Sequence, residues 1–100
     1  MAERSVTARI KNIGNVQWTF YTSMNIDGGQ EIEGTPLLLS PGQEGTVGWK
    51  FDDSNLMAGE HTVTVSVWKD RVGGTKLASA SAKFTVAEKV AAEIVSVTVS

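Results

Sequence analysis

Apolar and polar residues alternate along most of this 100-residue chain, and this period of two limits its fold more than any other feature. In a β-strand successive side chains point to opposite faces, whereas an amphipathic helix needs a period of 3.6 residues. The clearest case lies at 62–68, where Val63, Val65 and Val67 alternate with Thr, Ser and Trp residues. Similar alternation predicts further strands over 6–11, 18–26, 47–51, 77–86 and 94–100.

Turn signals separate these strands at short intervals. Asn12-Ile13-Gly14-Asn15, Asp27-Gly28-Gly29 and Gly73-Gly74 contain residues that tolerate positive φ. A short strand is expected over 30–33, and Pro41 marks a corner or edge after the apolar run 36–39. The crossover helices of a parallel sheet are missing from the pattern. The sequence therefore predicts an all-β fold, an immunoglobulin-like antiparallel β-sandwich of seven to eight strands, with an open barrel as the alternative.

The chain length fits one domain, and the apolar share of 41% is that of a globular protein. We assign 1–87 to the sandwich and 88–100 to a connector followed by an extra strand. That strand carries Ile94, Val95, Val97 and Val99, and three interpretations stay open for it. It folds back onto its own sandwich, begins a following domain, or pairs with a neighbouring subunit by strand addition. Left unpaired, an apolar strand without proline tends to aggregate.

Charge and cysteine content limit the partners. Nine basic and 11 acidic residues give a net charge of −2, which argues against nucleic-acid binding. No apolar run reaches the roughly 18 residues that would span a bilayer, so we expect no membrane insertion. The absence of cysteine excludes disulfides and thiol catalysis. The N-terminus has no apolar signal core, so we expect a protein that stays inside, a piece of a longer exported chain, or one released by lysis.

The sequence offers little catalytic chemistry. His61 is the single histidine, at a strand entry beside Glu60, where we expect an exposed or capping role rather than part of a triad. The clustered carboxylates are Asp27, Glu31 and Glu33 near one hairpin and Asp52 and Asp53 in one loop. Backbone hydrogen bonds in turns explain such residues, with a calcium site and glycoside hydrolysis as weaker alternatives. We therefore predict no enzyme activity, no cofactor and no metal.

The aromatic residues fall into two sets by strand parity. Those expected in the core are Trp18, Phe20, Trp49, Phe51 and Phe84. Tyr21 and Trp68 share their parity with polar residues and are expected on the surface, where an exposed Trp stacks on a sugar or contacts a protein. The alternative for Trp68 is partial cover by a loop or by Arg71. The candidate contact residues are therefore Tyr21, Trp68 and Arg71.

Four motifs follow one another along the chain. They are Lys11-Asn12-Ile13-Gly14-Asn15, the strand 18–26 with Asp27-Gly28, the corner Leu39-Ser40-Pro41-Gly42 before Val47-Gly48-Trp49, and the strand entry Ala58-Gly59-Glu60-His61-Thr62-Val63. With these motifs the stretch from Val6 to Val86 resembles the CARDB and APHP group of prokaryotic immunoglobulin-like domains. The resemblance implies an extracellular or envelope β-sandwich that often occurs in tandem, with no common set of catalytic residues.

One departure from that group concerns its first strand. Members usually begin with a strand of the I-x-x-V-x-V-S kind, placed before the strand that ends in the Asn-Gly turn. Here only five residues precede Val6, whereas a similar strand, Ile94 to Ser100, stands at the other end.

These observations predict a non-enzymatic structural or adhesion module of a surface or multidomain protein. We expect it to act by contact with a protein partner or by self-association, outside the cell or at the cell surface. One alternative is a virion structural protein, either a capsid decoration or a tail subunit. Another is a carbohydrate-binding module that holds a polysaccharide on exposed aromatic residues.

Overall fold

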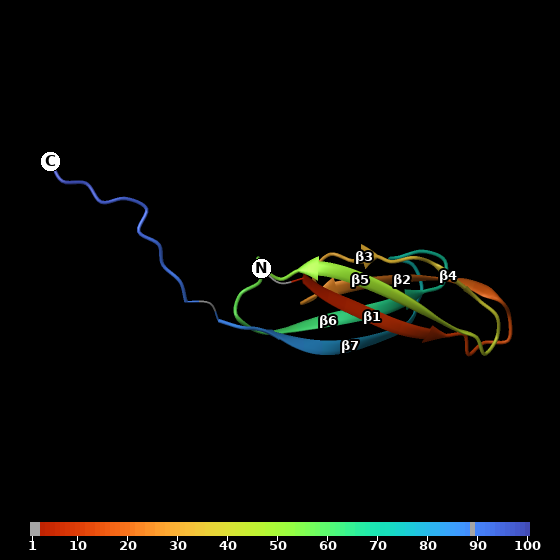
Figure 1. The fold of residues 1–100 in the computed structure, drawn as a ribbon. Coiled ribbons are helices and arrows are strands. Elements are labelled where there is room, and N and C mark those ends of the chain that lie inside the picture. Colours follow the sequence, from red (N-terminus) through yellow and green to blue (C-terminus); the bar gives the residue numbers. More distant parts are fainter. Residues whose placement is uncertain (1–2, 89) are drawn as a thin grey trace.

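A computed structural model of the chain describes residues 3–88 and 90–100. Its seven strands are all antiparallel, and the described residues contain no helix (Figure 1). The strands are β1 (Glu3–Lys11), β2 (Trp18–Ile26), β3 (Ile32–Glu33), β4 (Leu37–Leu39), β5 (Glu44–Asp52), β6 (Gly59–Trp68) and β7 (Lys76–Val86). The prediction of an all-β, antiparallel fold is therefore confirmed.

The strands form two sheets. β1 pairs with β5 along its whole length, from Glu3 opposite Asp52 to Lys11 opposite Glu44. The larger sheet has the order β3-β2-β6-β7, and β4 pairs with the first residues of β2. β1 and β7 are edge strands, because each is paired on one side only in the part of the chain that the structure describes.

The core lies between the two sheets. Met24 of β2, Val47 and Trp49 of β5 and Val63 of β6 are buried together. Phe51 and Phe84 pack against these residues. The rings of Phe51 and Phe84 meet edge to face, with their centroids 5.5 Å apart. The alternating residues predicted to face inward in β1, β5 and β6 do so, because burying one face of each strand removes apolar surface from water. Trp18 and Phe20, also expected in the core, are only half-buried.

The C-terminal segment, which we define as residues 94–100, lies apart from these sheets. It forms no strand, although its alternation predicts one, and every residue in it is exposed. Figure 1 shows it leading away from the end of β7, on the side where β1 begins. The long axis of the molecule therefore measures 78 Å, against 20 and 17 Å across. Of the predicted seven to eight strands, the described residues form seven, and all seven belong to the two sheets.

Candidate functional site

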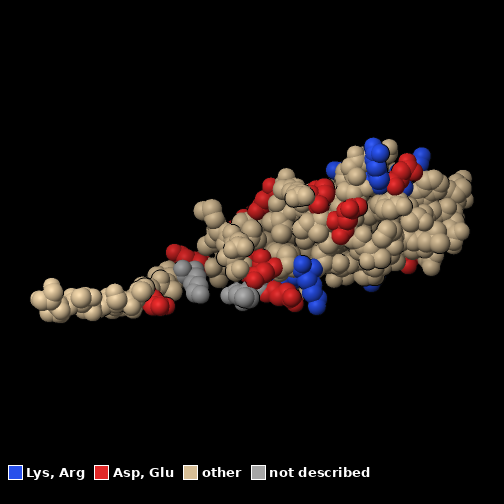
Figure 2. Space-filling view, turned by 90° about the horizontal axis from the view of Figure 1, so that it is seen from above, with Lys and Arg blue, Asp and Glu red and all other residues tan. Residues whose placement is uncertain are grey.

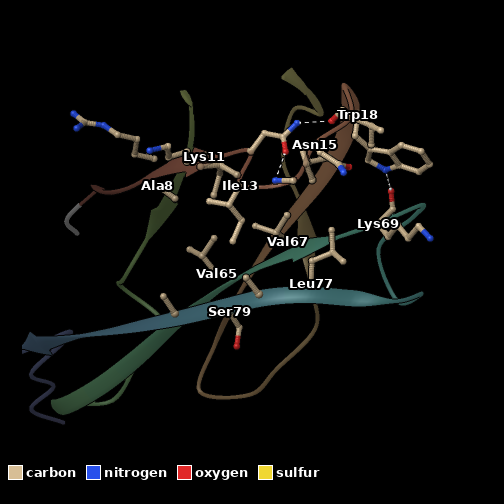
Figure 3. A pocket seen from close by; sticks show the side chains of 18 residues that line it. Ala8, Lys11, Ile13, Asn15, Trp18, Val65, Val67, Lys69, Leu77 and Ser79 are labelled. Atoms are coloured by element: carbon tan, nitrogen blue, oxygen red, sulfur yellow. Dashed lines mark hydrogen bonds between the residues drawn. The ribbon is translucent and has the colours of Figure 1, made fainter. Parts of the chain in front are cut away.

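A groove of about 700 Å³ separates β1 from β7. Val65 and Val67 of β6 form its floor, while residues 8–11 of β1 and 77–80 of β7 form its walls. Figure 3 shows Val65, Val67 and Leu77 pointing into this space, with Ile13 reaching toward them from the turn after β1. We call it the β1–β7 groove; it exposes part of the face that elsewhere forms the core.

The inner face of β7 is the most unusual part of the groove. Ala78, Ala80 and Ala82 lie opposite Val67, Val65 and Val63 of β6, on the face that points toward the other sheet. The sequence pattern predicted this inward direction correctly. All three alanines are nevertheless exposed, because no element of the described chain covers them. Small side chains at these positions leave the space beside them unfilled.

Both walls of the groove present backbone that no strand has paired. β1 hydrogen-bonds to β5 on its other side, and β7 to β6 on its other side. Edge strands of this kind offer rows of N–H and C=O groups, and an extended peptide can add to them as a further strand. An apolar floor between two such edges is suited to an extended, alternating segment.

Arg4 closes one end of the groove. Its Nε donates to Asp53 Oδ2 at 2.6 Å, and its Nη2 donates to the carbonyl oxygen of Thr85 at 2.7 Å. Its guanidinium carbon lies 4.8 Å from the ring centroid of Phe84. Arg4 therefore bridges the start of β1 to the end of β7. Since Ala8 and Ala80 border the groove further along, the two strands run in opposite directions.

The turn 12–16 borders the groove at its other end. Asn12 holds this turn: its side chain is 2% exposed, and its Nδ2 donates to the carbonyl oxygens of Val16 and Leu39 at 2.8 and 2.9 Å. Its Oδ1 accepts from the N–H of Gly14 at 2.9 Å. With the turn fixed in this way, Ile13 is 90% exposed at the mouth of the groove.

Trp68 corrects one expectation from the sequence. Its side chain was expected on the surface, yet the residue is only 8% exposed. The indole Nε1 donates to Ser23 Oγ at 2.8 Å, and Lys76 Nζ lies 5.0 Å from the ring centroid. Parity placed Trp68 on the outer face of the sheet correctly, but the indole is covered there and hydrogen-bonded to the neighbouring strand. Strand parity gives the face of a side chain and not its exposure.

Tyr21 and Arg71 do not combine with Trp68 into an exposed platform. Tyr21 is half-buried opposite Trp68 in the sheet, and Arg71 is exposed in the turn after β6. Tyr21 borders a shallow hollow of about 370 Å³ together with Trp18 and Lys69, and neither Trp68 nor Arg71 lines it. The covered indole of Trp68 therefore offers little stacking surface, whereas Tyr21 and Arg71 stay predicted contact residues.

His61 is fully engaged by neighbouring acceptors. Its Nδ1 lies 2.5 Å from Asp27 Oδ2, and its Nε2 lies 2.6 Å from the carbonyl oxygen of Met57. Two hydrogen bonds raise the pKa of His61, and the one to Asp27 has a larger effect than the one to the carbonyl oxygen of Met57. Two hydrogen bonds lower the pKa of Asp27, and the one from His61 has a larger effect than the one from the N–H of Thr62. Because both ring nitrogens face acceptors, the imidazolium form fits this site, which ties the turn after β2 to β6.

The other carboxylates have local partners too. Glu31 accepts from Ser23 Oγ and from Asn25 Nδ2, each at 2.6 Å. Asp52 accepts from the N–H of Ser54 at 2.8 Å, which lowers the pKa of Asp52. Within residues 3–88 and 90–100 no three potential metal ligands gather at one place. Asp27 and Asp52 accept from backbone N–H groups, as expected for turn residues, whereas Glu31 is bound by side chains of β2.

Comparisons with known proteins add no relative: no family model, no curated protein and no solved structure matches this chain. In the described part of the chain, no helix has the length and apolar character needed to cross a membrane.

Proposed function

We propose that this chain is an immunoglobulin-like β-sandwich module that is not an enzyme and acts by protein–protein contact or assembly. The observation that carries the proposal is the β1–β7 groove, where an apolar floor and two unpaired strand edges are open to solvent. A protein strand supplies both the side chains and the backbone groups that such a site lacks. The resemblance to the CARDB and APHP group supports the sandwich.

The hydrogen bonds that His61 and Asp53 make within the protein support a role without catalysis. Both nitrogens of His61 are held by Asp27 and Met57, and Asp53 is held by Arg4. A general base must be free to reach a substrate proton. The carbohydrate alternative loses its main support, because the indole of Trp68 is covered.

We propose the cell surface or the extracellular space as the place of action, as the resemblance implies. A virion structural role is the second candidate, and the same groove favours it equally, because a subunit of an assembly needs a contact surface of this kind. Detection of the protein on intact cells or in purified virus particles separates the two.

The groove can be tested as a contact surface by placing a charge on its wall. Ala80 lies opposite Val65 on the inner face of β7. Ser79 also borders the groove, but Figure 3 shows its side chain pointing to the opposite face of the strand. We expect Ala80→Glu to weaken self-association measured by sedimentation, because a buried unpaired carboxylate is costly, while the matched control Ser79→Glu changes it little. Equal association of Ala80→Glu and the wild type would contradict the proposed contact surface.

A further inference from the structure

We propose that the β1–β7 groove of one copy binds the C-terminal segment of a second copy as an added β-strand, so that copies join head to tail. This inference rests on the proposed function and names the partner: residues 94–100 of another molecule of the same chain. It brings together two apolar surfaces that are open to solvent in the single molecule, the β1–β7 groove and the C-terminal segment.

The C-terminal segment has the properties of a strand that lacks a partner. Val95, Val97 and Val99 share one face, and they are 88%, 81% and 91% exposed. Ile94, Ser96, Thr98 and Ser100 occupy the other face, and the segment has neither a charged side chain nor a proline. Figure 2 shows it as a thin extension of the molecule, without red or blue atoms toward its tip. Such a segment is expected to pair with an available strand edge.

The exposed stretch of β7 is long enough for this segment. The C-terminal segment has seven residues, and the run of β7 in which every residue is exposed, Lys76 to Lys83, has eight. Seven residues of a strand span roughly 20–23 Å. If the segment runs parallel to β7, Val95, Val97 and Val99 lie beside Ala78, Ala80 and Ala82.

The side chains match as well. A valine beside each alanine fills the space that the small side chain leaves, above Val65 and Val67 on the floor of the groove. The Ser and Thr residues on the opposite face then point to solvent. The same placement runs the segment antiparallel to β1, which is the more stable of the two pairings.

The ends of the groove favour a second copy over the chain's own tail. A segment returning from Val86 would enter at the end that Arg4 closes through its bonds to Asp53 and Thr85. We infer that a segment from another copy enters beside the turn 12–16, where Ile13 is exposed, and leaves the Arg4 bridge intact.

The geometry also fixes the type of assembly. The C-terminal segment leads away from the end of β7, whereas the groove lies toward the opposite end of the two sheets, to which the arrow of β1 points in Figure 1. The donor and acceptor surfaces of one molecule therefore differ and point in opposite directions. A head-to-tail contact gives a ring where the rotation between copies closes and an open chain where it does not, and the opposite directions of the two surfaces lead us to expect the open chain.

Two single variants with matched controls test the proposal. Val97→Glu places a charge on the inward face of the C-terminal segment, and Thr98→Glu places the same charge on its outward face. Ala80→Glu and Ser79→Glu form the corresponding pair in the groove. All four positions are exposed in the single molecule, so we expect each variant to fold, which circular dichroism verifies.

Sedimentation over a range of concentrations should show linear oligomers for the wild type, Thr98→Glu and Ser79→Glu. We expect self-association at least about tenfold weaker for Val97→Glu and for Ala80→Glu, because each buries an unpaired charge. A mixture of these two variants retains one intact groove and one intact tail. It should form a dimer, of twice the 10.7 kDa chain mass, and no larger species.

The outcomes separate this inference from the proposed function. Normal association of Val97→Glu, or no dimer in the mixture, would overturn the tail as the occupant; if Ala80→Glu still associates poorly, the groove remains a contact surface. Normal association of Ala80→Glu would overturn both proposals. A wild type that stays monomeric at every concentration would overturn assembly between copies.

Discussion

At the scale of single residues, a few polar side chains determine how the loops attach to the sheets. Asn12 joins the turn 12–16 to Leu39, and Asp27 joins the turn after β2 to His61 and Thr62. The sequence marked both segments as turns from their Asn, Asp and Gly residues. It could not show the tertiary partners, because Leu39 lies 27 positions from Asn12 and His61 lies 34 from Asp27.

The contact between His61 and Asp27 predicts a pH dependence of stability. Since the pKa of folded His61 is raised, its contribution is complete below the unfolded value of about 6.5 and is lost as the pH rises through the folded value. Since the pKa of folded Asp27 is lowered, its contribution is present above about 3.9 and is lost as the pH falls through the folded value. Urea unfolding at a series of pH values measures both changes.

The variant His61→Gln supplies the comparison for this experiment. It cannot become protonated, so we expect its stability to change less than that of the wild type between pH 6 and pH 8. Parallel curves for the two proteins across this range would show that the contact with Asp27 does not hold the imidazolium.

Asn12 gives a second prediction at this scale. Replacement by alanine removes three hydrogen bonds and leaves the buried carbonyl oxygen of Leu39 without its donor. We expect Asn12→Ala to lower the free energy of unfolding by about 1–3 kcal/mol. Asn15→Ala, at an exposed position of the same turn, is the control and should change it little. Equal effects of the two substitutions in urea unfolding would contradict the role given to Asn12.

At the scale of elements, alternation predicted most of the strands, although not the absence of one at 94–100, and which way most side chains point. It succeeded in β1, β5 and β6, where one face is apolar and the other polar. It placed Trp68 on the correct face but did not predict its burial, beside Ser23 of a neighbouring strand and Lys76 of β7. It could not reveal the open groove either, since alternation places Ala78 and Ala80 on the inner face without saying whether anything covers that face.

Close packing between elements predicts the effect of a substitution at Gly34, which follows β3. A Cβ atom there would lie 2.6 Å from Trp49 Cζ2 and 2.8 Å from both Thr22 Oγ1 and Val47 Cγ2. We expect Gly34→Ala to destabilise the fold by about 1–3 kcal/mol through overpacking. Gly48→Ala in β5 is the matched control, because its nearest contact would be 3.4 Å from the carbonyl oxygen of Val6. Thermal unfolding of both variants measures the difference, and equal midpoints would contradict the predicted clash.

At the scale of the whole molecule, the two sheets lack a strand in the β1–β7 groove, and the C-terminal segment lacks a strand to pair with. The body leaves an apolar groove between two unpaired strand edges, and the C-terminal segment is an apolar strand without a neighbour. The sequence raised strand addition to a neighbouring subunit as one of three interpretations. It could not identify the acceptor, because the groove is formed by β1, β6 and β7, which come from both ends of the chain.

Site-specific cross-linking between two variants tests the central claim most directly, because the natural chain contains no cysteine that would compete. The test mixture contains one protein with Ala80→Cys and a second protein with Val97→Cys. In the control mixture the second protein carries Ser96→Cys instead. After mild oxidation, we predict a disulfide-linked heterodimer of the Ala80→Cys and Val97→Cys chains, formed much faster than in the control, where the cysteine points away from the groove. Equal cross-linking in the two mixtures, or none in either, would contradict the binding of the C-terminal segment in the groove of a second copy.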